Sequence, residues 1–358
     1  MSGLKKLRNL IDILKDKASL IKATLSTAAS VNVAVLLSTT HDPSSPPPEK
    51  RVAVVLALGN GSRLTACSCI DAIMARLHGT HSAPVAIKCL FTIHNIITRG
   101  SFILNDQLSF YPSSGGRNFL NLSTFRDCSG AEMWELSSWV RWYAGFVEQN
   151  LMVSKVLGYY FCSSSGTNND KNKEERFLTF LDSDLSRELD VLVDFAERIC
   201  EVPDSLYLQR NDLVYEVVRL VSEDYRLLQL EIFLRVSELA NRTENLSDGE
   251  LTLMLNTLQR FEDCKERLLL LFANRKRNDR MWDLVSETKM KLITTREKRE
   301  GLRLVTMAGR RIDESLNQST RFRKPLMAAE SENLFFFGSG GGALVALDRV
   351  PLAVSTVG

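Results

Sequence analysis

The spacing of apolar residues along the chain predicts helices almost throughout. Leucine, isoleucine and valine recur three and four positions apart over most of the sequence, and the strict alternation typical of half-buried strands is nearly absent. Two segments, residues 69–77 and 83–100, are apolar on nearly every side, which indicates central helices surrounded by protein. Ser247 and Glu250 form a capping-box pattern before a further helix over 251–272. The pattern therefore predicts an all-α protein.

The first predicted helix, residues 4–25, is amphipathic and basic. Its apolar positions recur at helical spacing at Leu4, Leu7, Ile11, Leu14, Ala18, Ile21 and Leu25. Lysine and arginine outnumber aspartate among the remaining positions. A basic amphipathic helix is suited to lie in the interfacial layer of a membrane. It is equally suited to be the first core helix of a domain, with a solvated basic side, and the sequence leaves both interpretations open.

A proline-rich loop separates the next two predicted helices. The apolar segment Val31–Leu37 ends in Ser-Thr-Thr-His, four prolines follow between positions 43 and 48, and a helix begins at Glu49 with Lys50 and Arg51. This loop therefore places basic side chains at the start of a helix, where backbone N–H groups favour an anion.

A leucine stripe marks the start of the second half of the chain. Its members recur at nearly regular helical spacing at Leu178, Leu181, Leu185, Leu189, Leu192, Ala196 and Ile199. The carboxylates of this segment fall mostly on the opposite side, so they are predicted to form a solvated acidic face. Helical patterns continue past Trp282 to about residue 320.

Composition narrows the class of protein. The chain has 358 residues, of which 44% are hydrophobic and 25% charged, as expected for one large or two modest globular domains. There is no run of about 20 apolar residues and no signal-peptide pattern, so a cytosolic location is expected. Seven scattered cysteines fit reduced thiols.

The charge of the chain is unevenly distributed. Basic residues outnumber acidic ones over 1–173 and 273–324, whereas 174–272 is acidic. The basic segments suggest an anionic partner, either nucleic acid or a membrane surface.

Motifs of enzymes are absent from the sequence. There is no P-loop, nucleophile elbow, metalloprotease helix or kinase motif set. His94 lies in the most apolar helix and is predicted to be a hydrogen-bonded core histidine rather than a base. Cys67 and Cys69 lack a second pair at zinc-site spacing, and the aromatic residues lie in apolar helices rather than beside basic residues. We therefore expect no catalysis, no cofactor or metal and no nucleic-acid partner.

Several segments resemble one known family. They are VAIKCLFTIHNIITRG at 85–100, GGRNFLNLSTFRD at 115–127, WELSSWVRWYAGFVEQNL at 134–151 and FEDCKERL at 261–268. With the proline-rich loop, they resemble the ANTH domain of plant clathrin assembly proteins, over roughly residues 30–310. The resemblance implies an ANTH/ENTH-like α-helical solenoid of stacked antiparallel helices. It also implies a peripheral protein of clathrin-coated pits and vesicles, at the plasma membrane or the Golgi, that binds phosphatidylinositol 4,5-bisphosphate and clathrin heavy chain.

The patterns and the resemblance together predict five segments of the chain. They are the basic amphipathic helix at 1–28, the ENTH-like N-terminal part of the ANTH domain at 29–163, a polar connector at 164–175, the long-helix C-terminal part at 176–324 and a flexible Gly-containing tail at 325–358.

The proline-rich loop is the lipid site that the resemblance implies. In the family, a lysine begins this loop and basic residues open the next helix. Alignment through the Thr-Thr-His sequence puts Leu37 and Pro48 at two of the lysine positions, whereas Lys50 and Arg51 keep a basic side chain. The expected lipid-binding residues are Lys50, Arg51, His41, Lys5, Lys6 and Arg8.

The two replaced lysines leave an alternative open. The loop would then be only a connection between helices, and the chain an ANTH scaffold with a degenerate lipid site that binds protein partners such as SNARE helices. Lys50, Arg51 and the basic first helix favour lipid binding, whereas Leu37 and Pro48 favour the scaffold.

The tail carries the expected clathrin contact. Residues 344–348, LVALD, fit the family's clathrin-box pattern of leucine, apolar, any, apolar and acid. An extended peptide would present Leu344, Val345 and Leu347 to apolar grooves and Asp348 to a basic rim. A second match, Leu227–Glu231, lies in a predicted helix whose leucines should be buried, so the tail is the expected site.

Overall fold

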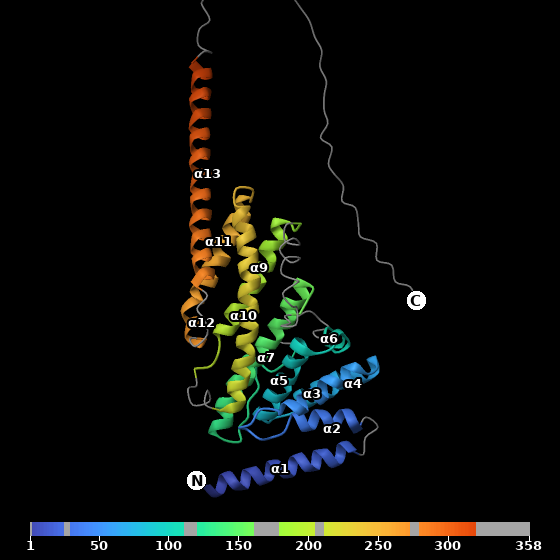
Figure 1. Ribbon diagram of the computed structural model, residues 1–358. Helices are drawn as coiled ribbons and strands as arrows, with labels where there is room; N and C mark the ends of the chain where they lie inside the picture. Colours follow the sequence, from blue (N-terminus) through green and yellow to red (C-terminus); the bar gives the residue numbers. More distant parts are fainter. Residues whose placement is uncertain are drawn as a thin grey trace, which may run out of the picture. The chain divides into compact units, whose positions relative to one another are not determined.

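The computed structural model describes residues 2–24, 29–110, 120–160, 179–204, 211–272 and 279–319. Over these ranges the chain is helical, with short connections and no strand, which confirms the predicted all-α class (Figure 1). The chain divides into two compact units, residues 1–301 and 302–358, and only the end of the last helix is described in the second unit.

The first helices belong to the part of the chain before residue 110. They are α1 (Ser2–Thr24), α2 (Ala29–Ser38), α3 (Glu49–Ala57), the short 3₁₀ helix η1 (Leu58–Asn60), α4 (Arg63–Gly79), α5 (Ala83–Arg99) and α6 (Phe102–Leu108). The later helices are α7 (Ala131–Leu157), α9 (Asp182–Cys200), α10 (Asp212–Asn241), α11 (Asp248–Asp263), α12 (Lys265–Leu271) and α13 (Asp279–Ser319). Neighbours along the chain pack on one another, as in a solenoid of stacked helices.

Helix α5 is the centre of the N-terminal part, as its sequence predicts. Every side chain from Ala83 to Ile97 is buried, because the helix packs against α4 on one side and α7 on another. The same prediction is wrong for residues 69–77 of α4. Asp71 and Ala75 are exposed there, so α4 buries only one side and covers α5 rather than lying inside the protein.

The predicted core histidine is confirmed in α5. His94 is fully buried, and its Nδ1 lies 2.8 Å from Tyr143 Oη on α7. Its Nε2 lies 2.9 Å from Asp224 Oδ2 on α10, and the same oxygen accepts a hydrogen bond of 2.7 Å from Asn150 Nδ2. Both ring nitrogens of His94 therefore have a partner, and the histidine joins three helices.

The predicted leucine stripe is buried from Leu185 to Ile199, whereas its first member, Leu178, lies outside the described residues. Helix α9 begins at Asp182, so Leu181 lies at the N-cap and is exposed. The expectation of a solvated acidic face is wrong for Glu188, which is buried and ion-paired with Arg235 of α10 at 2.7 Å. The carboxylates on the outer side of α9 are not all free in solvent either. Arg260 of α11 forms ion pairs with three of them, those of Asp190, Asp194 and Glu197.

Two features of the C-terminal helices were visible in the sequence and one was not. The capping box is present, with the Ser247 hydroxyl and the Glu250 carboxylate each bonding the other's backbone N–H. Helix α13 continues to Ser319, as the pattern predicts. However, the single helix expected over 251–272 is interrupted at Cys264, where α11 ends and α12 begins.

Candidate functional site

Helix α1 lies against α2 (Figure 1). The described members of its predicted apolar stripe, Ile11, Leu14, Ala18 and Ile21, are exposed together with Leu10, so the stripe is turned outward. The side chains of Leu10, Leu14 and Ile21 are 57%, 64% and 65% exposed, whereas Ala23, on the opposite side of the helix, is buried. The apolar stripe is therefore not what holds α1 on the domain. No helix among the described residues, α1 included, has both the length and the apolar character needed to cross a bilayer.

The inward side of α1 is polar and is anchored by a histidine. Asp16 accepts a hydrogen bond of 3.1 Å from the backbone N–H of His41, and its other oxygen lies 2.6 Å from His41 Nδ1. Lys17 and Lys22 are exposed beside the outward apolar stripe. Helix α1 thus presents leucine and isoleucine side chains with flanking ammonium groups, which is the arrangement of an interfacial helix.

The proline-rich loop, residues 39–48, is held by four helices. On the α4 side, Arg76 Nη2 donates to the Thr39 carbonyl at 3.1 Å, and on the α5 side Lys88 Nζ donates to Thr40 Oγ1 at 3.0 Å. The Ser44 carbonyl accepts from the backbone N–H of Leu213 at the start of α10, at 3.2 Å. With the contact to α1, these bonds make the loop a junction between helices rather than a free connection.

Lys88 is an unusual member of this junction because it is a buried ammonium. Its side chain is 1% exposed, and burial lowers the pKa of Lys88 to about 8. The charges of Asp42 and Asp16 act in the opposite direction and favour the ammonium form. The loop therefore rests on a cation whose protonated form is destabilised by its surroundings.

The start of α3 offers an open helix N-terminus beside two cations. Pro48 is the N-cap and supplies no side-chain hydrogen bond, so the first backbone N–H groups have no capping side chain. Lys50 and Arg51 follow directly and are exposed, and neither forms an ion pair within the described residues. Glu49 differs, because it pairs with Arg99 of α5 at 2.7 Å. The arrangement suits a phosphate group.

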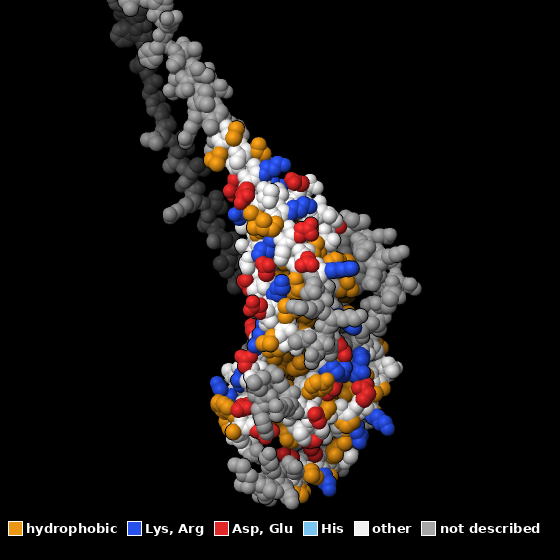
Figure 2. All heavy atoms as spheres, turned by 60° about the vertical axis from the view of Figure 1, so that its left-hand side comes forward, with side chains coloured by type: hydrophobic (Ala, Val, Ile, Leu, Met, Phe, Trp, Pro, Cys, Tyr) orange, Lys and Arg blue, Asp and Glu red, His pale blue; other side chains and the backbone are white. Residues whose placement is uncertain are grey.

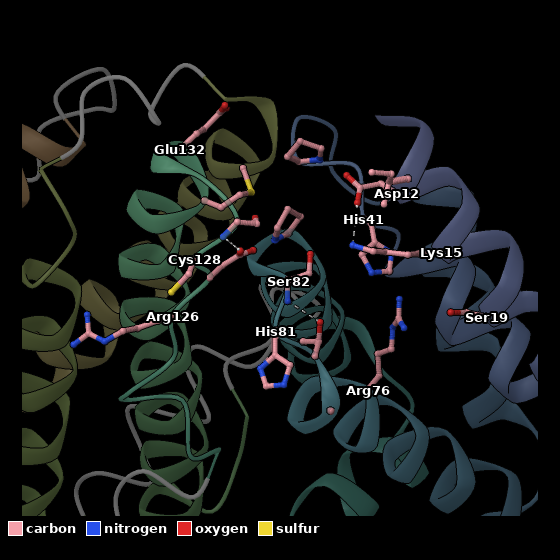
Figure 3. Close-up of a pocket in the computed structure, with 18 of the residues that line it drawn as sticks. Asp12, Lys15, Ser19, His41, Arg76, His81, Ser82, Arg126, Cys128 and Glu132 are labelled. Carbon is pink, nitrogen blue, oxygen red and sulfur yellow. Dashed lines mark hydrogen bonds and ion pairs between the residues drawn. The ribbon is translucent and has the colours of Figure 1, made fainter. Parts of the chain in front are cut away.

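A cleft separates α1 from the beginnings of α5 and α7 (Figure 3). Lys15, His41, Arg76 and His81 lie around it, with Arg126 on the side of α7. Acidic groups also line it, namely Asp12, Asp127 and Glu132. No sequence pattern predicted this cleft, because its residues come from segments that share no common motif.

The structure separates the residues expected to bind lipid. His41 lines the cleft of Figure 3 and its side chain is 11% exposed, whereas Lys50 and Arg51 do not line that cleft. Lys5, Lys6 and Arg8 lie in the first turns of α1, but their side chains are outside the described residues. The expected clathrin contact, Leu344, Val345, Leu347 and Asp348, is also outside the described residues.

Two cations of the second basic segment bond to backbone carbonyls of other helices or connections. Lys291 Nζ on α13 donates to the Ala240 carbonyl at 2.6 Å, and Arg299 Nη1 donates to the Leu246 carbonyl at 2.6 Å. Figure 2, which brings α13 forward, shows acidic and basic side chains mixed rather than gathered by sign.

Comparison with known proteins places the chain among related sequences. The profile of the ANTH domain family matches residues 30–276. A protein of Arabidopsis thaliana named "Putative clathrin assembly protein" is 44% identical over 290 residues, which cover 78% of this chain and 80% of that protein. Two further proteins of the same organism carry the same designation. One is 32% identical over 86% of this chain and 91% of its own length, and the other is 28% identical over 74% and 91%.

Proposed function

This chain belongs to the ANTH domain family, and we propose that it is a peripheral-membrane endocytic adaptor. It binds phosphoinositide-containing membrane and clathrin, and it promotes clathrin coat assembly and vesicle budding at the plasma membrane. Relatives named as clathrin assembly proteins, similar along most of their length, support the clathrin part. The observation that carries the membrane part is the outward apolar stripe of α1.

Helix α1 supports membrane contact because its apolar side has no partner in the described structure. Burial of one exposed leucine or isoleucine in an apolar layer stabilises the bound state by about 1.5–3 kcal/mol. Leu10, Leu14 and Ile21 are exposed on one side of α1, so their insertion would give much of the energy of binding. Lys17 and Lys22 would meet anionic headgroups at the border of the inserted stripe.

The start of α3 supports recognition of the headgroup phosphates. Lys50 and Arg51 add two cations to the uncapped helix N-terminus, and Val54, one turn later, is 50% exposed. A charge-assisted hydrogen bond to phosphate contributes about 1.5–3 kcal/mol. Since Leu37 and Pro48 replace two lysines of the family pattern, the headgroup site is weaker here, and α1 supplies a larger share of the membrane affinity.

His41 serves the same membrane surface indirectly. The side chain is engaged with Asp16, so its contribution is to orient α1 rather than to hold the headgroup. This assignment keeps Lys50 and Arg51 as the direct phosphate contacts. It also explains why the loop is held from four sides, because α1 can insert in a defined direction only if its anchor is fixed.

Sedimentation with liposomes tests the membrane part. The full chain should bind anionic liposomes in a salt-sensitive way, and more strongly when they contain phosphatidylinositol 4,5-bisphosphate. The double variant Lys50→Glu with Arg51→Glu should lose about tenfold in affinity, because repulsion replaces attraction at the helix N-terminus. The matched control is Arg280→Glu with Lys298→Glu, two exposed cations of α13, and it should bind like the unchanged protein.

The alternative is an ANTH scaffold that binds protein partners such as SNARE helices. The replacement of two lysines by Leu37 and Pro48 favours it. If the folded chain does not sediment with liposomes of either composition, the membrane proposal is wrong and the scaffold is preferred. If both charge-reversal variants lose affinity equally, the α3 site is wrong, while the membrane proposal stands on α1.

The clathrin contact is proposed to lie in residues 344–348. The other match to the pattern, Leu227–Glu231, is unsuitable because it belongs to α10 and both Leu228 and Glu231 are buried. A peptide of residues 325–358 should capture the clathrin terminal domain weakly, since a single short motif binds without avidity. Leu344→Ala with Leu347→Ala should abolish capture. Equal capture by both peptides, or by neither, would remove this segment as the contact.

A further inference from the structure

Two thiols meet where α9 and α11 end. Cys200 is the last residue of α9, and Cys264 is the residue at the break between α11 and α12. The Cys200 thiol donates to the Cys264 carbonyl at 3.8 Å. The proximity of the two thiols lowers the pKa of Cys264 and raises that of Cys200. Cys200 is partly buried and Cys264 is 7% exposed, so both lie at the edge of the core.

Arginine contacts before and after the two cysteines fix the end of α9 against α11 and α12. Towards the start of α9, Arg260 of α11 bonds Glu197 through Nε at 2.9 Å. Beyond the thiols, Arg267 of α12 donates to the Val202 carbonyl at 3.0 Å and pairs with Asp204. The end of α9 is thus fixed to the α11–α12 break at points before and after the sulfur atoms.

We propose that Cys200 and Cys264 are a redox-sensitive pair, which hydrogen peroxide converts into a reversible disulfide that locks the α11–α12 break onto the end of α9. The contact of Cys200 Sγ with the carbonyl of Cys264 and the flanking arginine bridges carry this proposal. The ordinary role of a buried cysteine, that of a small apolar side chain, does not require two thiols in mutual contact.

The reaction balances with one molecule of peroxide. The Cys264 thiolate attacks a peroxide oxygen, which gives a sulfenic acid and hydroxide, and the hydroxide takes the proton that Cys264 has lost. The Cys200 sulfur then attacks the sulfenic sulfur, and water leaves with the Cys200 proton. Two thiols give up two electrons, peroxide is reduced to two waters, and a dithiol reductant reverses the bond.

Cys264 is the better first nucleophile of the pair. The neighbouring Cys200 thiol, together with the guanidinium of Arg260, lowers the pKa of Cys264 against the opposing effects of burial and of the Glu197 and Asp263 carboxylates. The buried thiols of Cys69 and Cys89 provide a contrast within the same chain. Burial raises the pKa of each to about 12, so they stay protonated and unreactive.

The disulfide would close a loop that contains all of α10 and α11. The two cysteines are 64 positions apart, so the bond removes much of the freedom of the unfolded chain. It would also fix α12, whose C-cap residue Phe272 stacks on Tyr225 of α10 at 4.8 Å between ring centroids. Oxidation should therefore raise the thermal stability of the folded unit.

Peptide mapping of the full chain tests the proposal. The protein is treated with a small excess of hydrogen peroxide, remaining thiols are alkylated, and the tryptic peptides are identified by mass spectrometry. We expect one cross-linked species that joins the peptides of Cys200 and Cys264 and disappears with dithiothreitol. The melting temperature should rise by several degrees on oxidation and return on reduction.

Variants separate this pair from the other thiols. Cys200→Ser should abolish both the cross-link and the rise in melting temperature, whereas Cys128→Ser, at an exposed cysteine away from the pair, should retain both. Cross-linking between other cysteines, over-oxidation of Cys264 without a cross-link, or a cross-link with no change in melting temperature would each overturn the proposal. Mapping of the unchanged protein decides the matter even if a variant folds poorly.

Discussion

The N-terminal and C-terminal parts of the molecule differ in how they compensate the charge of a buried cation. In the C-terminal part, Arg235 of α10 is fully buried and contacts two carboxylates, Glu188 of α9 and Glu231 of its own helix, each at 2.7 Å. In the N-terminal part, Lys88 of α5 is equally buried, but its ammonium donates to the hydroxyl of Thr40. One cation is neutralised by direct contact, and the other is not.

This difference agrees with the roles that we propose for the two parts, a rigid frame in the C-terminal part and membrane binding in the N-terminal part. Neutralised charges hold α9, α10 and α11 together, which suits a rigid frame. The N-terminal part retains an incompletely compensated cation beneath its loop, an uncapped helix at Pro48 and an apolar stripe on α1. Such groups are costly to leave in water or in the protein interior. They become favourable when an anionic, partly apolar surface meets them, and a membrane is such a surface.

The largest expected effect comes from breaking the neutralised cluster. Arg235→Ala would leave Glu188 and Glu231 buried without a counter-charge, and should lower the free energy of unfolding by about 3–5 kcal/mol. The matched control is Arg187→Ala on α9, where the arginine is exposed and lies 3.6 Å from Asp184. That change should cost less than about 1 kcal/mol.

Urea denaturation, followed by circular dichroism, measures both changes. Liposome binding by Arg235→Ala should be unaltered under conditions in which the variant is folded, because the cluster lies away from α1 and α3. Equal stability of the two arginine variants would contradict the view that this cluster holds the C-terminal helices together.

The cluster also shows what sequence analysis could and could not predict. Periodicity predicted α5 and α13 because each helix repeats a local pattern, and the Ser247–Glu250 cap depends on residues three positions apart. The partner of Glu188 is 47 positions away, so no local pattern could reveal it, and the carboxylate was wrongly assigned to a solvated face. Ion pairs between helices depend on packing, which the spacing of residues within one helix does not specify.

The candidate site was predictable to a similar extent. Lys50 and Arg51 were found because they open a helix and match a family pattern, and the structure leaves both exposed. The amphipathic character of α1 was also evident, but its orientation was not, since the spacing of residues within one helix does not specify whether its apolar or its polar face meets the neighbouring helix. The engagement of His41 by Asp16 decides that orientation, and the two residues are 25 positions apart.

The second prediction tests the outward face of α1. Changing Leu10, Leu14 and Ile21 to glutamine should lower the affinity for anionic liposomes by about tenfold or more, because the inserted apolar area is lost. The free energy of unfolding should change by less than about 1 kcal/mol, since these side chains are already exposed. Liposome sedimentation and urea denaturation give the two measurements.

A matched control for this variant exists on α13. Leu302, Leu304 and Val305 are 61%, 70% and 71% exposed, and their change to glutamine should leave lipid affinity as it is. If the α1 variant instead loses stability and keeps its lipid affinity, the apolar stripe packs on protein, and the contrast between the two parts of the molecule disappears.

The smallest expected effect concerns the contribution of Lys88 to the pH dependence of the free energy of unfolding. Its pKa is about 8 in the folded protein and 10.5 as the ordinary value. Between these values the unfolded chain holds a proton that the folded chain lacks, so a rise in pH favours the folded state. Below pH 8 both states are protonated and the cost of the buried ammonium is fully present. Lys88→Met removes this titration and keeps a similar side-chain volume.

The informative quantity is the free energy of unfolding of the unchanged protein minus that of Lys88→Met, measured by urea denaturation across pH. The buried cysteines titrate in both proteins, so their effect cancels in this difference. The difference should rise in favour of the unchanged protein by about 1–2 kcal/mol between pH 7.5 and 9.5. A difference that stays constant over this range would mean that Lys88 is as well compensated as Arg235. The two parts of the molecule would then not differ in how they hold a buried charge.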